Sequence, residues 1–113
     1  MSTARGQQAE LAAAAFLEYH GCTIIARNWR TRWCEIDVIA QRDGVIYFVE
    51  VKYRSSNAWG TGLDYITPKK LQQMQFAAEF WRARHGAQGL CKIAAAELTG
   101  DPPRVTGWVR DVG

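Results

Sequence analysis

Hydrophobic positions in this chain follow two periods, and the change between them outlines its secondary structure. Between residues 6 and 20 they recur every three or four residues, which predicts an amphipathic helix that ends at Gly21. Residues 22–30, 35–40 and 45–52 instead alternate or run together with β-branched and aromatic side chains, as strands do. The Asp43-Gly44 pair before the last segment is typical of a two-residue hairpin turn. We therefore expect a three-stranded meander after the first helix.

The second half of the chain predicts another helix and two more strands. Residues 55–65 are rich in Gly, Ser and Asn, which predicts a loop. Thr67 and Pro68 are typical of an N-cap and a first helical residue, and the apolar positions that follow keep helical spacing up to Gly86. Residues 90–98 and 105–112 resemble strands, although the three alanines at 94–96 are unusual in one. The order αβββαββ predicts an α/β fold in which two helices flank a mixed sheet.

Length and composition indicate a globular protein. The 113 residues suffice for one domain, 1–113, with its own core, and the charged fraction of 22% is ordinary for such a domain. The apolar runs are too short to cross a membrane, and residues 1–7 lack the basic-then-apolar pattern of a secretory signal. We therefore expect a cytoplasmic protein. The three cysteines have no metal-binding spacing and are expected to be reduced thiols: Cys22, Cys34 and Cys91.

The predicted hairpin carries charges where a sheet should be apolar. Counting outward from its turn pairs Asp37 with Glu50 and Glu35 with Lys52. Like charges that face each other destabilise a sheet, and carboxylates among apolar neighbours are costly unless a cation neutralises them. Mg²⁺ binds one or two carboxylates together with water and phosphate, so Asp37 and Glu50 are candidate ligands. Alternation places Lys52 on the face of Glu50, where it can orient an attacking water. The purely structural alternative is a Glu35–Lys52 ion pair with Asp37 solvated.

Basic and aromatic residues gather near these acids. The net charge is only +3, but lysines and arginines concentrate at residues 27–32 and 52–70. Clusters of this kind attract phosphate, and indole rings near arginines, such as Trp29 and Trp33, can stack on unpaired bases. The candidate nucleic-acid contacts are Arg27, Arg30, Arg54, Trp59 and Lys70. The alternative is that the arginines only solubilise strand ends and a loop, and that the rings pack within the core.

A set of short motifs resembles known families. The set comprises Arg5-Gly6, Ala9-Glu10, Gly21, Ala26-Arg27-Asn28-Trp29-Arg30, Glu35-Ile36-Asp37, Phe48-Val49-Glu50-Val51-Lys52, Arg54, Trp59-Gly60 and Lys70. Asp37 followed by Glu50-Val51-Lys52 resembles the PD-(D/E)xK, or restriction-endonuclease-like, superfamily and its small Holliday-junction resolvases. The wider set, which covers residues 5–80, resembles the YraN-like family of small bacterial proteins.

This resemblance implies a restriction-endonuclease-like mixed sheet flanked by two helices, and a catalytic site on it. Asp37 and Glu50 would hold Mg²⁺ or Mn²⁺, Lys52 would serve the hydrolytic water, and Glu10 would complete the acidic site. The implied activity is hydrolysis of phosphodiester bonds in DNA, with branched or distorted DNA favoured. Taken without the resemblance, Glu10 is equally a solvated helix residue placed to suit the helix dipole.

The chain departs from the family pattern at two positions, and two other classes of function stay open. Cys34 stands where the family usually has glycine, and Ala94 where an acid is expected. A nucleic-acid-binding module would bind DNA in a salt-sensitive way without divalent-dependent cutting. An adaptor would use the Trp59 loop and an exposed edge strand to bind a protein. A monomer of this size would cut one strand at a time, so a homodimer is considered for cleavage of both.

Overall fold

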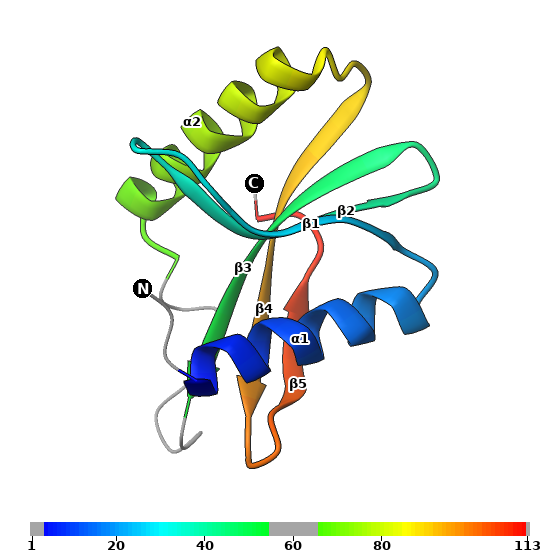
Figure 1. Ribbon diagram of the computed structural model, residues 1–113, viewed down its shortest axis with the longest axis vertical. Coiled ribbons are helices and arrows are strands. Elements are labelled where there is room, and N and C mark those ends of the chain that lie inside the picture. Colours follow the sequence, from blue (N-terminus) through cyan, green and yellow to red (C-terminus); the bar gives the residue numbers. More distant parts are fainter. Residues whose placement is uncertain (1–3, 55–65, 113) are drawn as a thin grey trace.

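The elements of the computed structural model, which describes residues 4–54 and 66–112, follow the predicted order (Figure 1). The helices and strands are α1 (Ala4–Tyr19), β1 (Thr23–Arg30), β2 (Glu35–Arg42), β3 (Val45–Arg54), α2 (Pro68–His85), β4 (Leu90–Thr99) and β5 (Arg104–Val109). The predicted α/β class is confirmed, as is the order αβββαββ. The predicted loop at 55–65, with Trp59, lies outside the described residues.

One mixed sheet carries these strands in the order β1-β2-β3-β4-β5. The first three form the predicted antiparallel meander, β4 runs parallel to β3, and β5 returns antiparallel to β4. A parallel pair needs a crossover connection, and α2 supplies it between β3 and β4. Because β3 lies at the centre of the sheet, both of its edges are paired.

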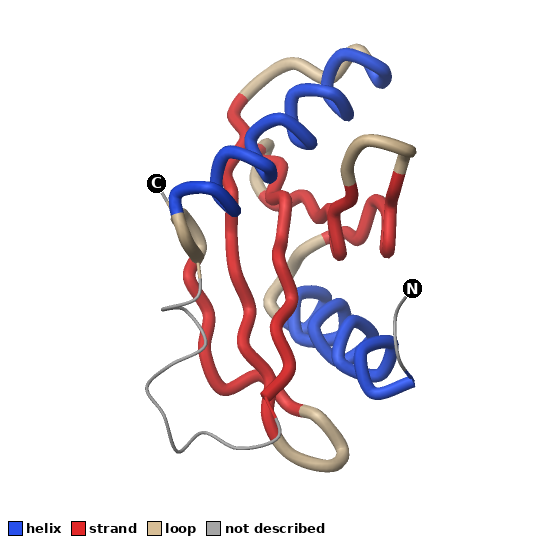
Figure 2. Tube along the Cα trace, turned by 90° about the vertical axis from the view of Figure 1, so that its left-hand side faces the viewer, coloured by secondary structure: helices blue, strands red, loops and turns tan. Residues whose placement is uncertain are grey.

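The helices pack on opposite faces of the sheet, as successive residues of β3 show. Phe48 packs against Trp81 of α2 with ring centroids 5.7 Å apart, whereas Val49 belongs to the core cluster of Ala13 in α1. Figure 2 shows the two helices as separate layers beside the strands. Neither helix, in the part of the chain that the structure describes, is long and apolar enough to span a membrane. The free thiols, each partly buried, are Cys22, Cys34 and Cys91.

Asp43 and Gly44 form the predicted turn between β2 and β3. Both residues have positive φ, 52° and 78°, as a type I′ turn requires. Arg42 pairs with Val45 beside the turn, and the ladder continues outward to the pair of Val38 and Val49. The register counted from the turn is therefore confirmed over this stretch.

The predicted pair of Asp37 and Glu50 lies one step beyond the last paired residues of β2 and β3, and the two side chains are neighbours. The paired residues of β2 and β3 end at Val38 and Val49 within the described strands. One residue further, Asp37 Oδ2 accepts a hydrogen bond from the backbone N–H of Val51 at 2.8 Å. A partly buried carboxylate needs donors, so the Asp37 side chain takes the bond that a strand carbonyl would accept.

The predicted pair of Glu35 and Lys52 lies outside the described ladder of β2 and β3. On their other edges, Glu35 pairs with Arg30 of β1, and Lys52 pairs with Glu97 of the parallel strand β4. The predicted register extended the hairpin ladder outward to residues 35 and 52, whereas the described pairs of β2 and β3 end at Val38 and Val49. The other edge of β3 pairs with β4 from Val45 to Arg54.

Capping residues bound α2 as the sequence predicts. Thr67 Oγ1 accepts a hydrogen bond from the Lys70 backbone N–H at 3.1 Å. Gly86 takes the left-handed conformation, with φ of 59°, that commonly ends a helix. The N-cap fixes the first turn of α2, and this turn carries Lys70 to the site described next.

Candidate active site

Asp37 lies where β2 leaves its ladder with β3, and its side chain is turned toward β3. Its Oδ2 is held by the Val51 N–H, and the Glu50 carboxylate is close enough to form a hydrogen bond with it. Burial and the charge of Glu50 raise the pKa of Asp37 to about 8, although the Val51 N–H favours the ionised form. The fold therefore brings together the two carboxylates that the sequence singled out. Burial makes it costly for both of them to carry a negative charge there.

Lys70 supplies a positive charge to this pair. Its Nζ lies 3.1 Å from Oε2 of Glu50, and both side chains are only partly exposed. The sequence predicts Lys70 as a nucleic-acid contact, and the structure places it directly against an acid of the site. This contact joins the first turn of α2 to the centre of the sheet.

Glu10 is buried on α1, with a relative exposure of 8%, which contradicts its interpretation as a solvated helix residue. Burial raises the pKa of its carboxyl, while the nearby Arg30 and Arg27 lower it and Glu35 raises it. Its charge also acts on Asp37, where it favours the protonated form. The two arginines predicted as DNA contacts thus lie within electrostatic reach of a buried acid.

Three carboxylates do not converge on one point. Across residues 4–54 and 66–112, no group of three or more His, Cys, Asp or Glu side chains is arranged to hold a metal ion. Asp37 and Glu50 therefore form a pair of oxygen donors, and Glu10 acts on that pair through its charge. Two carboxylates are within the number that Mg²⁺ uses in proteins, the rest of its shell being water and substrate phosphate.

Lys52 and Arg54 lie further along β3, beside a buried acid that the sequence reasoning missed. Glu97 of β4 has a relative exposure of 5% and pairs with Lys52 in the parallel register. Arg54 Nε lies 3.7 Å from its Oε2, and Thr106 Oγ1 lies 3.5 Å from its Oε1. Only the pairing of β3 with β4 reveals this acid, because the alanines before it give no sign of a site.

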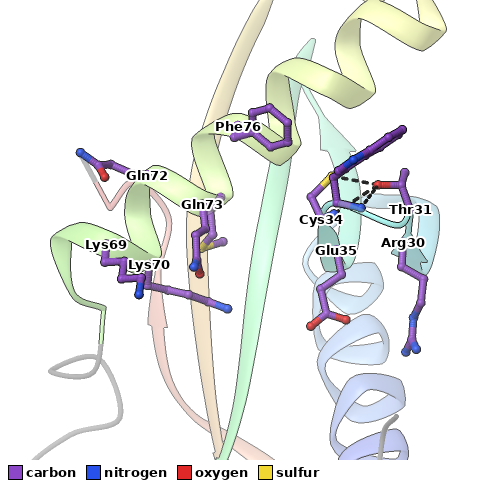
Figure 3. Close-up of a pocket in the computed structure, with 11 residues that line it drawn as sticks. Arg30, Thr31, Cys34, Glu35, Lys69, Lys70, Gln72, Gln73 and Phe76 are labelled. Atoms are coloured by element: carbon purple, nitrogen blue, oxygen red, sulfur yellow. Dashed lines mark hydrogen bonds between the residues drawn. The ribbon is translucent and has the colours of Figure 1, made fainter.

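A cleft of about 630 Å³ adjoins the acidic pair. One wall is the turn between β1 and β2, and the other is the first half of α2. The lining residues are Arg30, Thr31, Trp33, Cys34, Glu35, Lys69, Lys70, Gln72, Gln73, Met74 and Phe76. Figure 3 shows Lys69, Lys70 and Gln73 on the α2 side, and Arg30 with Glu35 on the other. Lys70 belongs to both the cleft and the Glu50 ion pair, so a ligand in the cleft lies next to the acids.

The protein is an α/β protein with two acids on the hairpin of β2 and β3. Comparison with known proteins gives its family. Residues 9–98 match the model of the family described as Uncharacterised protein family UPF0102. The chain is 36% identical to a UPF0102 protein of Neisseria meningitidis over 109 residues, 96% of this chain and 93% of that protein. It is 34% identical to one of Nitrosomonas europaea over 107 residues, 95% and 91% of the two chains. It is 39% identical to one of Halorhodospira halophila, over 95% and 84%.

The chain therefore belongs to the UPF0102 family, which is the YraN-like family that the sequence motifs resemble. These names state membership of a family and no reaction.

Proposed function

We propose that this protein is a Mg²⁺- or Mn²⁺-dependent endonuclease that hydrolyses phosphodiester bonds in DNA. The observation that carries the proposal is the convergence of Asp37 and Glu50 beside Lys70, which also lines a basic cleft. Paired oxygen donors suit a hard divalent cation, and the lysines and arginine of the cleft suit a phosphate backbone. Branched or distorted DNA is the favoured substrate.

The two carboxylates fit the metal that the proposal requires. The raised pKa of Asp37, caused by burial and by Glu50, indicates that it is energetically costly for both carboxyl groups to be ionised. A bound divalent cation would favour the ionised forms of both groups. When bound, Mg²⁺ or Mn²⁺ would polarise the scissile phosphate and increase the acidity of a coordinated water.

The remaining groups have distinct proposed roles around that pair. Lys52, which is exposed on β3, orients the attacking water. Lys70 is the counter-charge of Glu50 and can move to a phosphate oxygen when the acid is otherwise neutralised. Glu10 attracts Arg27 and Arg30 by its buried charge. Arg54 and the Trp59 loop remain proposed DNA contacts.

A second candidate is a nucleic-acid-binding module without catalysis. The specific observation in its favour is the Lys70–Glu50 ion pair at 3.1 Å, because a protein cation already compensates one of the two acids. Such a module would bind DNA through the basic cleft and would need no metal. A protein adaptor and a homodimer remain predictions from the sequence.

The test of the endonuclease is a cleavage assay with the purified chain on linear, flapped and four-way DNA, with Mg²⁺, Mn²⁺ or EDTA. We expect divalent-dependent cutting that falls at least about a hundredfold in Glu50→Gln and Asp37→Asn, because each change removes a charged ligand. Lys52→Ala is expected to be impaired as well. Glu18→Gln, on the exposed side of α1, is the matched control and should cut normally.

The outcomes separate the candidates. Cutting that survives both Glu50→Gln and Lys52→Ala comes from a contaminant and leaves the endonuclease without support. Salt-sensitive DNA binding that persists in Asp37→Asn, with no cutting by wild type under any condition, favours the binding module.

A further inference from the structure

Three aromatic side chains form a continuous surface beside the cleft, and we call Trp33, Phe76 and Phe80 the aromatic ledge. Trp33 comes from the turn between β1 and β2, and the other two come from α2. The ring centroids of Trp33 and Phe80 are 5.8 Å apart, and those of Phe76 and Phe80 are 6.1 Å apart. Trp33 is 65% exposed and Phe76 is 54% exposed. Rings this exposed contribute little to the core, so their clustering suggests a binding surface.

Basic side chains surround the aromatic ledge. The guanidinium of Arg32 lies 5.4 Å from the centre of the Trp33 ring, and that of Arg84 lies 5.8 Å from the centre of the Phe80 ring. The cleft on one side of Trp33 contains Arg30, Lys69 and Lys70. A second cavity of about 550 Å³ continues on the other side of Trp33, between the strand turn and the end of α2. Aromatic rings interleaved with cations along a groove are typical of surfaces that bind single-stranded nucleic acid.

The cleft also offers groups that can bind to base edges. Gln72 and Gln73 are exposed on α2 and line the cleft near Lys70. A side-chain amide has two donors and one acceptor, which suits the edge of an unpaired base. Glu35 is the one acid among the described lining residues, so the cleft as a whole favours an anion.

We propose that the aromatic ledge binds an unpaired strand of nucleic acid whose bases stack on Trp33 and Phe76. The phosphates of that strand contact Arg30, Lys69 and Lys70, and Lys70 connects the strand to the acidic pair. Bases in a duplex have both faces covered by their neighbours, so only unpaired bases can use these rings. The inference rests on the proposed function and narrows its substrate to DNA with a single-stranded segment next to the cut.

Charge favours this occupant over a second copy of the chain. In a two-fold dimer the same patch would face itself, so the arginines and lysines around Trp33 would meet like charges. A polyanion instead releases its counterions when it meets the same groups. The surface is therefore better suited to nucleic acid than to its own copy.

The test measures fluorescence anisotropy of a labelled oligothymidylate and of a labelled duplex of equal length, with EDTA present so that no strand is cut. We expect Trp33→Ala to weaken single-strand binding roughly tenfold, which is the loss of about one stacked base. Duplex binding should change less than about twofold, because the phosphate contacts remain. Trp33→Phe keeps a ring and should retain most of the affinity. Tyr19→Ala removes an 87% exposed aromatic ring from the end of α1 and should change neither affinity.

Each other outcome has a defined meaning. Equal single-strand affinity of wild type, Trp33→Ala and Tyr19→Ala overturns the proposal. Light scattering that finds a dimeric wild type and a monomeric Trp33→Ala also overturns it and assigns the aromatic ledge to a second copy. Loss of single-strand binding in Trp33→Ala, with no cutting of any DNA by wild type, supports the aromatic ledge as a binding surface and overturns the endonuclease proposal. Glu50-dependent cutting of fully paired DNA, without single-strand binding, supports the endonuclease proposal and overturns the binding surface.

Discussion

The electrostatics of Asp37 is the clearest physical feature of this protein at the scale of single residues. The side chain is held in one place by the Val51 N–H, next to Glu50 and within reach of the charge on Glu10. In the unfolded chain the carboxyl has a pKa near 3.8, whereas burial and Glu50 raise it to about 8 in the fold. The folded protein therefore retains a proton that the unfolded chain releases. It follows that this group opposes folding increasingly as pH rises between these two values.

The first prediction is that Asp37→Asn increases stability at alkaline pH. Asparagine keeps an acceptor for the Val51 N–H but has no charge to bury. The free energy of unfolding of wild type should fall between about pH 4 and pH 8, and the variant should lose most of that fall. The gain at about pH 8 is on the order of a few kcal/mol. Urea denaturation of both proteins at acidic and alkaline pH measures it. A variant less stable than wild type at alkaline pH contradicts the raised pKa.

The same measurement tests the metal. Millimolar Mg²⁺ should stabilise wild type at alkaline pH, because a ligand that binds only the folded state adds to its free energy of unfolding. Asp37→Asn should not respond, since one of the two carboxylates is gone. An equal response of both proteins would show that the ion binds elsewhere.

At the scale of elements, the start of α2 is the segment that joins local sequence to the site. The Thr67 hydroxyl accepts a hydrogen bond from the backbone N–H of Lys70, and the Lys70 side chain contacts Glu50. A helix leaves its first N–H groups without partners inside the helix, so a capping hydroxyl stabilises the first turn. Here that turn also carries a charge to the acidic pair. The cap is therefore expected to affect both the helix and the site.

The second prediction concerns this cap. Thr67→Ala should lower the free energy of unfolding by about 1 kcal/mol, because the Lys70 N–H loses its acceptor. Thr67→Ser retains the hydroxyl and is the matched control, with stability close to that of wild type. Urea denaturation at neutral pH gives both values. If serine is as damaging as alanine, the methyl group rather than the hydrogen bond matters.

At the scale of the whole molecule, small side chains in β4 pack against α1 on one face of the sheet. Ala94 and Ala96 are 0% and 1% exposed and belong to the same core cluster as Ala9 and Ala13 of α1. The alanine triplet weakens the strand prediction when read locally, since alanine has little preference for strands. In the fold it forms part of a buried strand, where two of its three small side chains pack in the cluster that contains α1 residues.

The third prediction follows from this packing. Ala96→Leu should destabilise the protein by about 1–3 kcal/mol, because the added methylenes have no space beneath α1. Ala15→Leu makes the same change on the exposed side of α1 and should be nearly neutral. Thermal unfolding of the two variants beside wild type compares them. A stable Ala96→Leu protein would mean that the core contains unfilled space at this position.

The sequence by itself determined the elements, their order and most of their ends. Helical spacing, strand alternation, the Asp43-Gly44 turn and the Thr67 cap each act over a few residues, so they can be read without knowledge of the fold. Alternating charges on apolar strands also singled out Asp37 and Glu50. These signals survive folding because each is satisfied within one element or one hairpin.

Only the tertiary structure decided how residues from different elements meet. It paired β3 with β4, ended the hairpin ladder at Val38 and Val49, and buried Glu10 of α1. It also set Lys70 against Glu50 and formed the basic cleft from two segments distant in the sequence. The physical reason is that such contacts depend on register, crossover and helix packing, which are properties of the assembled layers and of no single segment.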